Sequence, residues 1–369
     1  MKITRVEPFI LHVPVTGARI ADSTNQVTHW GAPGVIVYTD GGIEGFGYTG
    51  TLGHLTTDRL IRDCIGETLG PLLVGEDAIS VRALWQKLHS TSGVHWVGRA
   101  GVTQMALSAV DIALWDIKAK AADMPLWKLL GGSESARVEA YNTDGGWLNW
   151  SKQELVDCAR AMVADGFRGV KLKIGKPDSH EDLDRIEAVR NAIGPRVNLM
   201  VDANAIWDLP TALRFGARLK DFDVYWIEEP LGPDDVPGHA QLARSITTPI
   251  ALGEQLYSPI RFRDFITAGA VHFVQPDATR IGGITPCWQA VELASTFGLP
   301  VVLHAADMVQ VHLQMSIAHS ACDLLEYIPW LRHCFEEPAT VEDGFFKTPQ
   351  MPGAGTTLRA DAIDKYGVQ

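Results

Sequence analysis

The sequence predicts an α/β fold, a (β/α)-barrel that follows a smaller α+β domain. From about residue 137, eight short apolar runs alternate with amphipathic stretches of ten to twenty residues, which is the pattern of a TIM-type barrel. Before that point, strand-like patterns come first and helical patterns follow, as in small α+β domains. The length of 369 residues is too great for one ordinary domain and sufficient for about two.

The amino-terminal part is predicted to form an α+β domain over residues 1–125. Apolar and polar residues alternate in its strand-like segments, and apolar residues recur at helical spacing in its helix-like segments. The predicted elements are a strand, a hairpin and two helices, over residues 1–15, 35–48, 77–89 and 103–121. A Met-Pro-Leu segment and a Gly-Gly pair then interrupt the pattern, so we place the start of the barrel domain, 126–339, there.

The eight apolar runs of the second part predict the barrel strands. These runs are residues 138–143, 169–174, 197–202, 224–229, 250–254, 273–277, 301–304 and 324–327. Helices are predicted between them, among others over residues 152–165, 181–193, 211–220, 260–268 and 284–297. A single apolar run could equally be part of a buried helix, but eight at regular intervals favour a barrel.

Ionisable residues stand at or near the carboxyl ends of the second to eighth runs, separated by roughly 25 residues, one strand–helix unit. They are Lys173, Asp202, Glu228, Glu254, Asp277, His304 and Glu326. The carboxyl ends of parallel barrel strands meet at one face, where barrel enzymes carry their chemistry. One such residue could be a solvated strand end, but seven in consecutive units predict an active site.

Three carboxylates of this series predict a metal site. Asp202, Glu228 and Glu254 belong to consecutive strands, and without a cation they would repel one another. Ligands that are all oxygen atoms favour Mg²⁺ over zinc or copper, and Asn204 could assist them. The alternative is that these carboxylates form salt bridges to barrel arginines. We expect one Mg²⁺ per subunit.

Two lysines and a histidine are the candidate bases. Lys171 and Lys173 lie two residues apart on one strand, so both side chains point to the same side. Close to each other and to a metal, they are expected to shift toward the neutral form that a base needs. Asp277 and His304 are expected to form a dyad in which the carboxylate orients the imidazole. Glu326, on the last strand, could donate a hydrogen bond to a substrate carboxylate oxygen, provided that it stays protonated.

Together these groups predict that the protein removes a proton α to a carboxylate. A metal on one carboxylate oxygen and an acid on the other would stabilise the dianion that forms when this proton leaves. A Schiff-base aldolase that uses Lys173 is a different possibility, but it would not require three carboxylates on consecutive strands.

The composition limits the classes of partner. Hydrophobic residues make up 46% and charged residues 21%, as in ordinary globular proteins. The formal net charge of −12 does not indicate binding to nucleic acid or to an anionic membrane, because both require clustered Lys and Arg side chains. No apolar stretch approaches the roughly 18 residues that a membrane-spanning helix needs. The five cysteines are dispersed and never form a CxxC pair, which indicates a reducing, cytoplasmic environment.

Seven short motifs carry a resemblance to a known family. They are Lys171-Leu172-Lys173, Asp202-Ala203-Asn204, Glu228-Glu229-Pro230, Gly253-Glu254, Gln275-Pro276-Asp277, Leu303-His304 and Leu325-Glu326. In these seven motifs, taken together, the chain resembles the mandelate racemase subgroup of the enolase superfamily. The resemblance implies a modified (β/α)7β barrel, with a capping domain that residues 340–369 complete, and a homo-oligomer, either a dimer or an octamer.

The resemblance also implies roles for the site residues. The metal ligands would be Asp202, Glu228 and Glu254, while Lys173 and the dyad of His304 and Asp277 would act on opposite faces of the substrate. Further similarity, to D-galactarolactone cycloisomerases, covers residues 22–24, 28–31, 96–101, 139–144 and 325–330.

This similarity implies opening of an aldarolactone to a 3-deoxy-2-keto-hexarate by proton abstraction and β-elimination. The alternatives left open are an acid-sugar dehydratase acting on an open aldarate or aldonate, a racemase or epimerase, and an inactive sugar-acid binder.

The cap is expected to determine which sugar acid or lactone binds, because its loops close over the barrel mouth in this superfamily. The candidate loops are residues 16–31 and 49–55, although either could be an ordinary surface loop. The candidate substrate contacts are Asn204, Asn142, Thr143, His54, Trp96 and Arg99.

Overall fold

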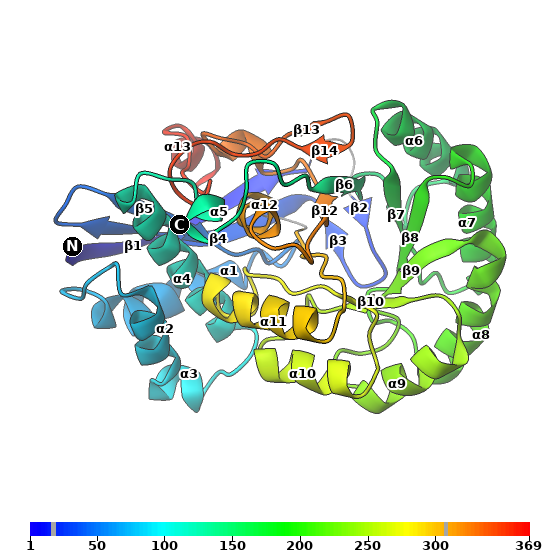
Figure 1. Cartoon of the computed structure of the whole chain (residues 1–369), viewed down its shortest axis with the longest axis horizontal. Helices are drawn as coiled ribbons and strands as arrows, with labels where there is room; N and C mark the ends of the chain where they lie inside the picture. Colours follow the sequence, from blue (N-terminus) through cyan, green and yellow to red (C-terminus); the bar gives the residue numbers. More distant parts are fainter. Residues whose placement is uncertain (16–19, 306–308) are drawn as a thin grey trace.

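The cap is built on a three-stranded antiparallel sheet in the order β1-β4-β5, formed by Ile3–Pro14, His29–Thr39 and Glu44–Tyr48. The structure, a computed structural model, describes residues 1–15, 20–305 and 309–369. Helix α4 (Val102–Ala121) packs on this sheet (Figure 1). Gly47 permits the close approach, because a Cβ there would lie 1.9 Å from the carbonyl oxygen of Ala109.

The smaller cap elements differ in part from the predicted ones. They are β2 (Ile20–Ala21), β3 (Gln26–Val27), α1 (Asp58–Asp63), α2 (Val81–His89) and α3 (Ser92–His95), with helical turns at Cys64–Leu69 and Gly70–Leu72. The helix expected from residue 77 begins at Val81, because Asp77 pairs with Lys2 at the start of the sheet. The predicted loop 16–31 contains the β2–β3 hairpin and the start of β4, and its residues 16–19 lie outside the described part.

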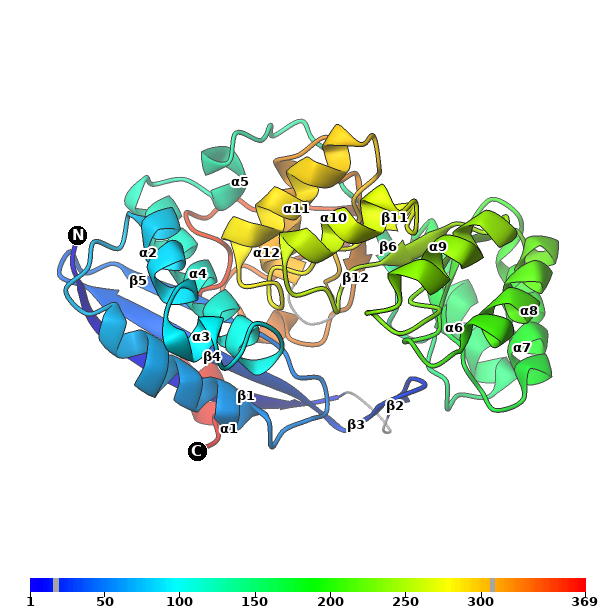
Figure 2. The ribbon, with the colours of Figure 1, turned by 90° about the horizontal axis from the view of Figure 1, so that it is seen from below.

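The barrel is a closed ring of parallel strands, as predicted. The strands are β6 (Glu139–Asn142), β7 (Gly169–Lys173), β8 (Asn198–Asp202), β9 (Val224–Glu228), β10 (Ile250–Leu252), β11 (Phe273–Val274) and β12 (Leu324–Tyr327). They pair in chain order from β6 to β11, and β12 pairs with β6. Figure 2 shows the cap sheet and the β2–β3 hairpin lying along one side of this ring.

Helices cover the outside of the barrel. They are α6 (Lys152–Ala164), α7 (Ser179–Ile193), α8 (Leu209–Leu219), α9 (Val236–Ser245), α10 (Pro259–Thr267), α11 (Ile284–Thr296) and α12 (Val309–Ile317), and α5 (Leu126–Leu129) joins the cap to the barrel. Side-chain caps start several of them, and Ser151 and Glu154 form a reciprocal capping box on α6. In the described part of the chain, no helix is both long enough and apolar enough to cross a membrane.

The seventh predicted strand, residues 301–304, is reduced to one bridge between Val301 and Val274. The His304 N–H still donates to the carbonyl of Pro276 at 3.2 Å, as in a parallel ladder. Pro276 has no backbone N–H and cannot donate a hydrogen bond back to residues 301–304, so the regular ladder ends there. His304 therefore lies at a strand position even though the strand itself is short.

The carboxyl-terminal segment lies against both parts of the molecule. Its elements are β13 (Val341–Glu342), β14 (Phe345–Phe346) and α13 (Ala362–Tyr366). Strand β14 pairs antiparallel with barrel strand β6, whereas Gly367 forms a bridge with Leu11 of the cap. The prediction that 340–369 completes the cap thus fits only the end of the segment, because the β13–β14 hairpin extends the barrel sheet.

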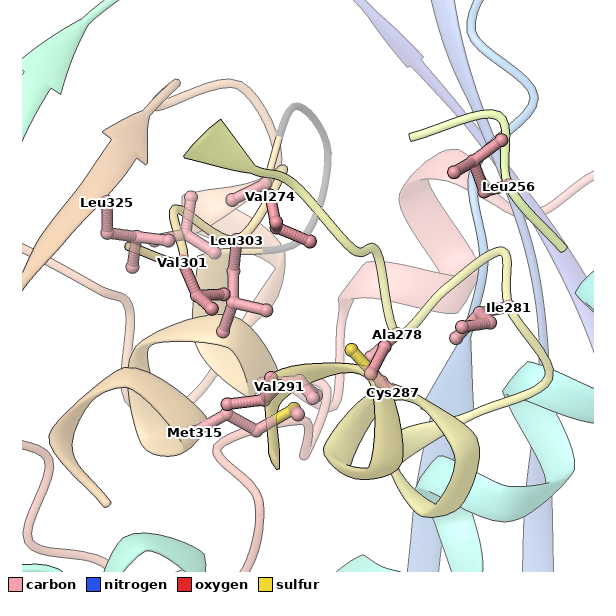
Figure 3. Close-up of a cluster of buried hydrophobic side chains, with 14 of the residues drawn as sticks. Leu256, Val274, Ala278, Ile281, Cys287, Val291, Val301, Leu303, Met315 and Leu325 are labelled. Carbon is pink, nitrogen blue, oxygen red and sulfur yellow. The ribbon is translucent and has the colours of Figure 1, made fainter. Parts of the chain in front are cut away.

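The hydrophobic core runs from the barrel into the cap without a break. In Figure 3, aliphatic side chains from the last barrel strands face side chains of α11 and α12; the labelled residues include Val274, Val301, Leu303, Leu325, Val291 and Met315. Burying each such side chain contributes roughly 1.5–3 kcal/mol. This packing holds the short seventh strand, and with it His304, in place.

A buried carboxylate of the cap joins the cap to the barrel. Asp111 on α4 accepts hydrogen bonds from the N–H and the hydroxyl of Thr285, at 2.9 and 2.8 Å, and thereby caps α11. Gly283 makes the contact possible, because a Cβ there would lie 2.3 Å from Asp111 Oδ2. Burial raises the pKa of Asp111 from 3.8 to about 7, although its bonds to Thr285 oppose the shift.

This raised pKa predicts a pH-dependent stability. The folded state keeps the proton on Asp111 up to about pH 7, whereas the unfolded chain releases it near pH 4. The folded state therefore binds more protons across this window, and stability falls as the pH rises. Asp111→Asn cannot titrate, so we expect the wild type to lose more stability than this variant between pH 5 and pH 8, by up to roughly 3 kcal/mol. Thermal melts at both pH values test this, and parallel pH profiles would contradict it.

Candidate active site

The strand register places Lys173, Asp202 and Glu228 side by side. In the parallel ladder, Lys173 pairs with Asp202 and Asp202 pairs with Glu228. Glu254 follows β10 after Gly253, where a positive φ of 151° and a backbone oxygen 2.5 Å from any Cβ require glycine. All four charged side chains are buried. The consecutive strand ends thus form a row of charged groups inside the protein.

The two lysines are held in their charged form by neighbouring carboxylates. Lys171 Nζ lies 2.7 Å from both Glu228 Oε1 and Glu326 Oε1. Lys173 Nζ lies 2.5 Å from Asp202 Oδ2. Burial alone would lower the pKa of each lysine, but the attraction of these carboxylates exceeds it and raises both pKa values. The expected shift of the lysines toward neutrality depends on a metal close by and stays a prediction; without the metal, these ion pairs oppose it.

Glu326 does not meet the condition for donating a hydrogen bond, because its pKa is lowered. Its Oε1 accepts a hydrogen bond from the Thr143 hydroxyl at 2.7 Å, in addition to the contact with Lys171. Burial alone would raise the pKa of Glu326, but Lys171 and His304 lower it to about 2. A carboxylate accepts hydrogen bonds and donates none. Lys171, and not Glu326, is the proton-bearing group at this position.

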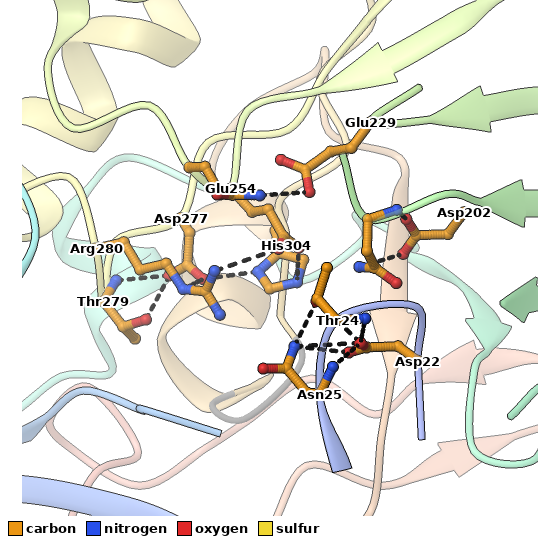
Figure 4. A network of polar contacts seen from close by, with 12 residues as sticks. Asp22, Thr24, Asn25, Asp202, Glu229, Glu254, Asp277, Thr279, Arg280 and His304 are labelled. Carbon is orange, nitrogen blue, oxygen red and sulfur yellow. Dashed lines mark hydrogen bonds and ion pairs between the residues drawn. The ribbon is translucent and has the colours of Figure 1, made fainter. Parts of the chain in front are cut away.

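His304 and Asp277 make the contact that the sequence predicts. His304 Nδ1 lies 2.7 Å from Asp277 Oδ2, and its Nε2 lies 2.5 Å from Glu254 Oε2 (Figure 4). Burial alone would lower the pKa of His304, but these carboxylates raise it well above its usual value. Thr279 donates its N–H and its hydroxyl to Asp277 Oδ1, at 2.7 and 2.6 Å. Asp277 is thus fixed on both oxygens and orients the imidazole.

The donor set fits a hard divalent cation. Asp202, Glu228 and Glu254 provide carboxylate oxygens only, and burial together with neighbouring carboxylates raises the pKa of Glu228 to about 7 although Lys171 opposes it. Asn204 Oδ1 is buried and has no hydrogen-bond partner in the described part of the chain. Among the described residues, no three His, Cys, Asp or Glu side chains converge on a single point. Each carboxylate instead contacts a Lys, Arg or His side chain.

Two cavities meet at this row of charged groups. The inner cavity has only about 30 Å³ of free space and is lined by Asp22, Val27, Trp30, Leu52, Thr143, Trp147, Lys173, Asn204, Glu254, Arg280, His304, Glu326 and Ile328. The outer cavity, of about 490 Å³, is lined by Thr24, Asn25, Gly50, Thr51, Leu52, His54, Thr57, Met105, Asn204, Ala205, Glu254, Gln255, Tyr257 and Arg280. Cap and barrel residues therefore enclose the reactive groups together.

The structure brings some predicted substrate contacts to these cavities and not others. Asn204 lines both cavities, Thr143 lines the inner one and His54 the outer one. Asn142 is buried at the end of β6, where its side chain accepts a hydrogen bond from the N–H of residue 144 at 2.9 Å. Trp96 is 84% exposed and, like Arg99, lies between α3 and α4 and lines neither cavity.

Several residues of the site were not predicted from the sequence. Arg280 lies 3.3 Å from Glu254 and 3.6 Å from Asp277, and it lines both cavities. Its position three residues after Asp277 was the signal that could have revealed it. His312, on α12, lies 3.2 Å from Asp277 Oδ1 behind the dyad. Asp22 reaches the inner cavity from the β2–β3 hairpin; it lies in the predicted cap loop 16–31 but was not singled out within it.

Two family models match the chain. The first, described as the mandelate racemase/muconate lactonizing enzyme N-terminal domain, matches residues 5–131. The second, described as enolase C-terminal domain-like, matches residues 154–362. Together they cover most of the cap and most of the barrel.

Characterised proteins similar to this chain act on sugar acids. The L-talarate/galactarate dehydratase of Salmonella typhimurium is 41% identical over 290 residues, covering 79% of this chain and 72% of that protein. The 3,6-anhydro-alpha-L-galactonate cycloisomerase of Streptomyces coelicolor is 34% identical over 368 residues, covering 99% of each chain.

Solved structures with the same architecture contain magnesium. The Salmonella L-talarate/galactarate dehydratase with Mg and L-lyxarohydroxamate superposes with a TM-score of 0.92 at 35% identity, covering 100% of this chain and 93% of that one. A racemase from Streptomyces coelicolor with bound magnesium superposes with a TM-score of 0.91 at 33% identity, covering 99% of this chain and 100% of that one.

Proposed function

Since the chain belongs to the enolase superfamily, in its mandelate racemase/muconate lactonizing enzyme branch, we propose that it is a Mg²⁺-dependent enzyme of sugar-acid β-elimination. It removes the proton α to the carboxylate of a hexaric acid or its lactone and expels a group from the β-carbon. The sugar-acid relatives and the magnesium in similar structures support both parts of this proposal.

One observation carries the proposal. Lys173 from β7 and His304 from the seventh strand both reach the inner cavity, which Glu254 borders and beside which Asp202 and Glu228 lie. Two proton-carrying groups from different strands that line one cavity could act on the two faces of a carbon held between them. Neither a binding protein nor a Schiff-base aldolase requires this arrangement beside three carboxylates.

The residues divide the chemistry among themselves. When bound by Asp202, Glu228 and Glu254, Mg²⁺ offsets the negative charge that develops on the substrate carboxylate. A cation on the carboxylates that neighbour Lys173 and His304 would lower the pKa of both side chains, and the deprotonated one, Lys173 at Nζ or His304 at Nε2, would then accept the α-proton. Asp277 keeps the proton on His304 Nδ1, so Nε2 is the nitrogen that exchanges protons with the substrate.

The surrounding groups position the substrate. Lys171 Nζ, which lies between Glu228 and Glu326, donates a hydrogen bond to the substrate carboxylate as negative charge builds up on it. The small free volume of the inner cavity excludes bulk water from the reacting carbon.

Two leaving groups are compatible with this machinery. Dehydration of an open hexaric acid expels a hydroxyl, which one of the proton-carrying groups must protonate, and the similarity to the talarate/galactarate dehydratase favours this outcome. Opening of an aldarolactone, the first expectation from the sequence, expels a carboxylate that needs no proton. The cycloisomerase relative, which matches nearly the whole chain, favours this second candidate.

A substrate panel distinguishes the outcomes. The Mg²⁺-loaded protein is incubated in D₂O with hexaric acids and with their lactones, and products are followed by NMR. We expect a 3-deoxy-2-keto-hexarate with deuterium at the new carbon–hydrogen bond, from the diacid for dehydration or from the lactone for cycloisomerisation. Deuterium exchange without a keto product would indicate epimerisation instead. EDTA is expected to abolish turnover, and activity that survives complete metal removal would refute the proposal.

A further inference from the structure

A buried ion pair on α7 lies outside the cavities of the active site. Asp182 Oδ1 and Arg185 Nη1 are 2.9 Å apart, and the two side chains are 1% and 5% exposed. Neither side chain lines the inner or the outer cavity. The pair can therefore affect a bound substrate only through the groups that it binds.

Arg185 connects two segments that contribute to the inner cavity. Its Nη1 donates to the backbone carbonyl of Lys173 at 3.1 Å, and its Nη2 donates to the backbone carbonyl of Trp147 at 3.0 Å. Lys173 is the last residue of β7, whereas Trp147 belongs to the loop between β6 and α6. The side chains of both residues line the inner cavity. One guanidinium thus fixes the backbone behind two lining residues.

Asp182 binds the residues that follow Lys173. Its Oδ2 accepts hydrogen bonds from the backbone N–H groups of Gly175 and Lys176, at 2.8 Å each. The N–H of Lys173 donates to the carbonyl of Gly146 at 2.7 Å, on the side of β6. The backbone is therefore held at Lys173 itself and directly after it, where the strand ends and the loop to α7 begins.

Stability alone does not account for a charged pair at this position. Burial raises the pKa of Asp182 and lowers the pKa of Arg185, so taking both charges out of water has a cost. Apolar side chains of similar volume often stabilise a buried site as well as an ion pair does. Apolar side chains could not, however, bind the two carbonyls and the two N–H groups that this pair holds.

We propose that Asp182 and Arg185 are positioning residues for proton transfer at Lys173, and that they act through the backbone. This inference rests on the proposed function, which makes Lys173 one of the two proton-carrying groups. The Lys173 ammonium stands on a flexible four-carbon stem, so a fixed backbone narrows the positions that Nζ can reach. A displacement of about 1 Å at a reacting group can lower a rate by roughly 100-fold.

Arg185→Met and Arg185→Lys test this role, with the substrate that the Mg²⁺-loaded wild type converts best. Methionine donates no hydrogen bond, whereas lysine keeps a cation beside Asp182 but lacks the planar fork that binds both carbonyls. We expect Arg185→Met to lower kcat roughly 100-fold and to change KM less than about threefold. Arg185→Lys is expected to lower kcat roughly tenfold. Because Arg185→Lys keeps the ion pair, it tests the proposal even if Arg185→Met does not fold.

Arg190→Met is the matched control, because Arg190 lies on the same helix and binds backbone carbonyls away from the site. Its guanidinium donates to the carbonyls of Gly194, Val197 and Phe222. We expect this variant to melt at a lower temperature than the wild type and to keep the kcat of the wild type. A loss of kcat as large as that of Arg185→Met would indicate general loosening of the barrel and would overturn the positioning role.

A double variant shows whether Arg185 acts through Lys173. If it does, losing Arg185 should matter little once the Lys173 side chain is gone. We therefore expect the kcat of the variant that combines Lys173→Met and Arg185→Met to lie within about threefold of that of Lys173→Met alone. Losses that multiply in the double variant would show that Arg185 acts on another part of the site, and they would overturn the proposal.

The outcomes separate this inference from the proposed function. Wild-type kcat in folded Arg185→Met and Arg185→Lys enzymes overturns the positioning role and leaves the proposed function intact. If the wild type converts no sugar acid, the proposed function fails, and the role in proton transfer falls with it. In a crystal structure of Arg185→Met, the Lys173 carbonyl is expected to move by about 1 Å. A Lys173 that keeps its place in that structure overturns the positioning role, whatever the enzyme's activity.

Discussion

Glu228→Gln is expected to abolish turnover. Glutamine has the same shape but no charge, so it removes one of three anionic ligands from the site. Loss of a residue that only supports a metal ligand costs roughly 10–100-fold in metal affinity or activity, and loss of a ligand itself should cost more. Turnover of the hexaric acid panel and Mg²⁺ affinity by calorimetry, both on the purified variant, measure the effect.

The matched control for this variant is Glu187→Gln, which removes a carboxylate from the exposed face of α7. It is expected to behave like the wild type in both measurements. Thermal melts show whether Glu228→Gln stays folded, since it also takes an ionic partner from Lys171. A folded Glu228→Gln enzyme that binds Mg²⁺ and turns over normally would show that the ligand assignment is wrong.

Lys173→Met and His304→Asn are expected to lower kcat by roughly 10²–10⁴-fold each, the usual contribution of a general acid or base. Their exchange behaviour should differ if, as the proposed function requires, the two side chains act on different faces of the substrate carbon. The variant that loses the base should also lose deuterium exchange at the α-carbon in D₂O. The variant that loses the acid should keep this exchange while elimination is slow.

Lys152→Met, at an exposed position on α6, is the control for the loss of a lysine charge. It should leave both exchange and elimination at wild-type rates. Equal loss of exchange in Lys173→Met and His304→Asn would mean that neither side chain acts alone as the base. Full activity in either variant would remove that side chain from the mechanism.

The strand ends of the site could be predicted because the barrel imposes them. Parallel strands in chain order bring the residues at their carboxyl ends together, whatever the helices between them contain. Lys173, Asp202 and Glu228 are neighbours in the ladder for this reason alone. The contact between His304 and Asp277 follows from the same rule, although the seventh strand is only one bridge long.

Charge states at the site could not be predicted from the order of the strands. They depend on which side chains lie opposite one another inside the ring, as Lys171 does between Glu228 and Glu326. These contacts of 2.7 Å outweigh the cost of burial: they raise the pKa of Lys171 and lower that of Glu326. A pattern along the chain carries no information about such distances.

The contribution of the cap was the least predictable part. Leu52 lines both cavities, and the loop that carries it contacts other elements, as in the hydrogen bond from Thr51 to Asp58. Trp96 was expected at the site and is exposed instead. A loop can be recognised in a sequence, but the side chains that it presents depend on its long-range contacts.

The contact between Asp111 and α11 has a consequence for the independence of the two domains. The cap provides the carboxylate that caps a barrel helix, and that helix begins a few residues after Asp277. The barrel alone would leave the first turn of α11 without this partner. A cap transplanted from another enzyme would have to supply an acidic residue at the same place in its long helix. The two domains are therefore not interchangeable modules.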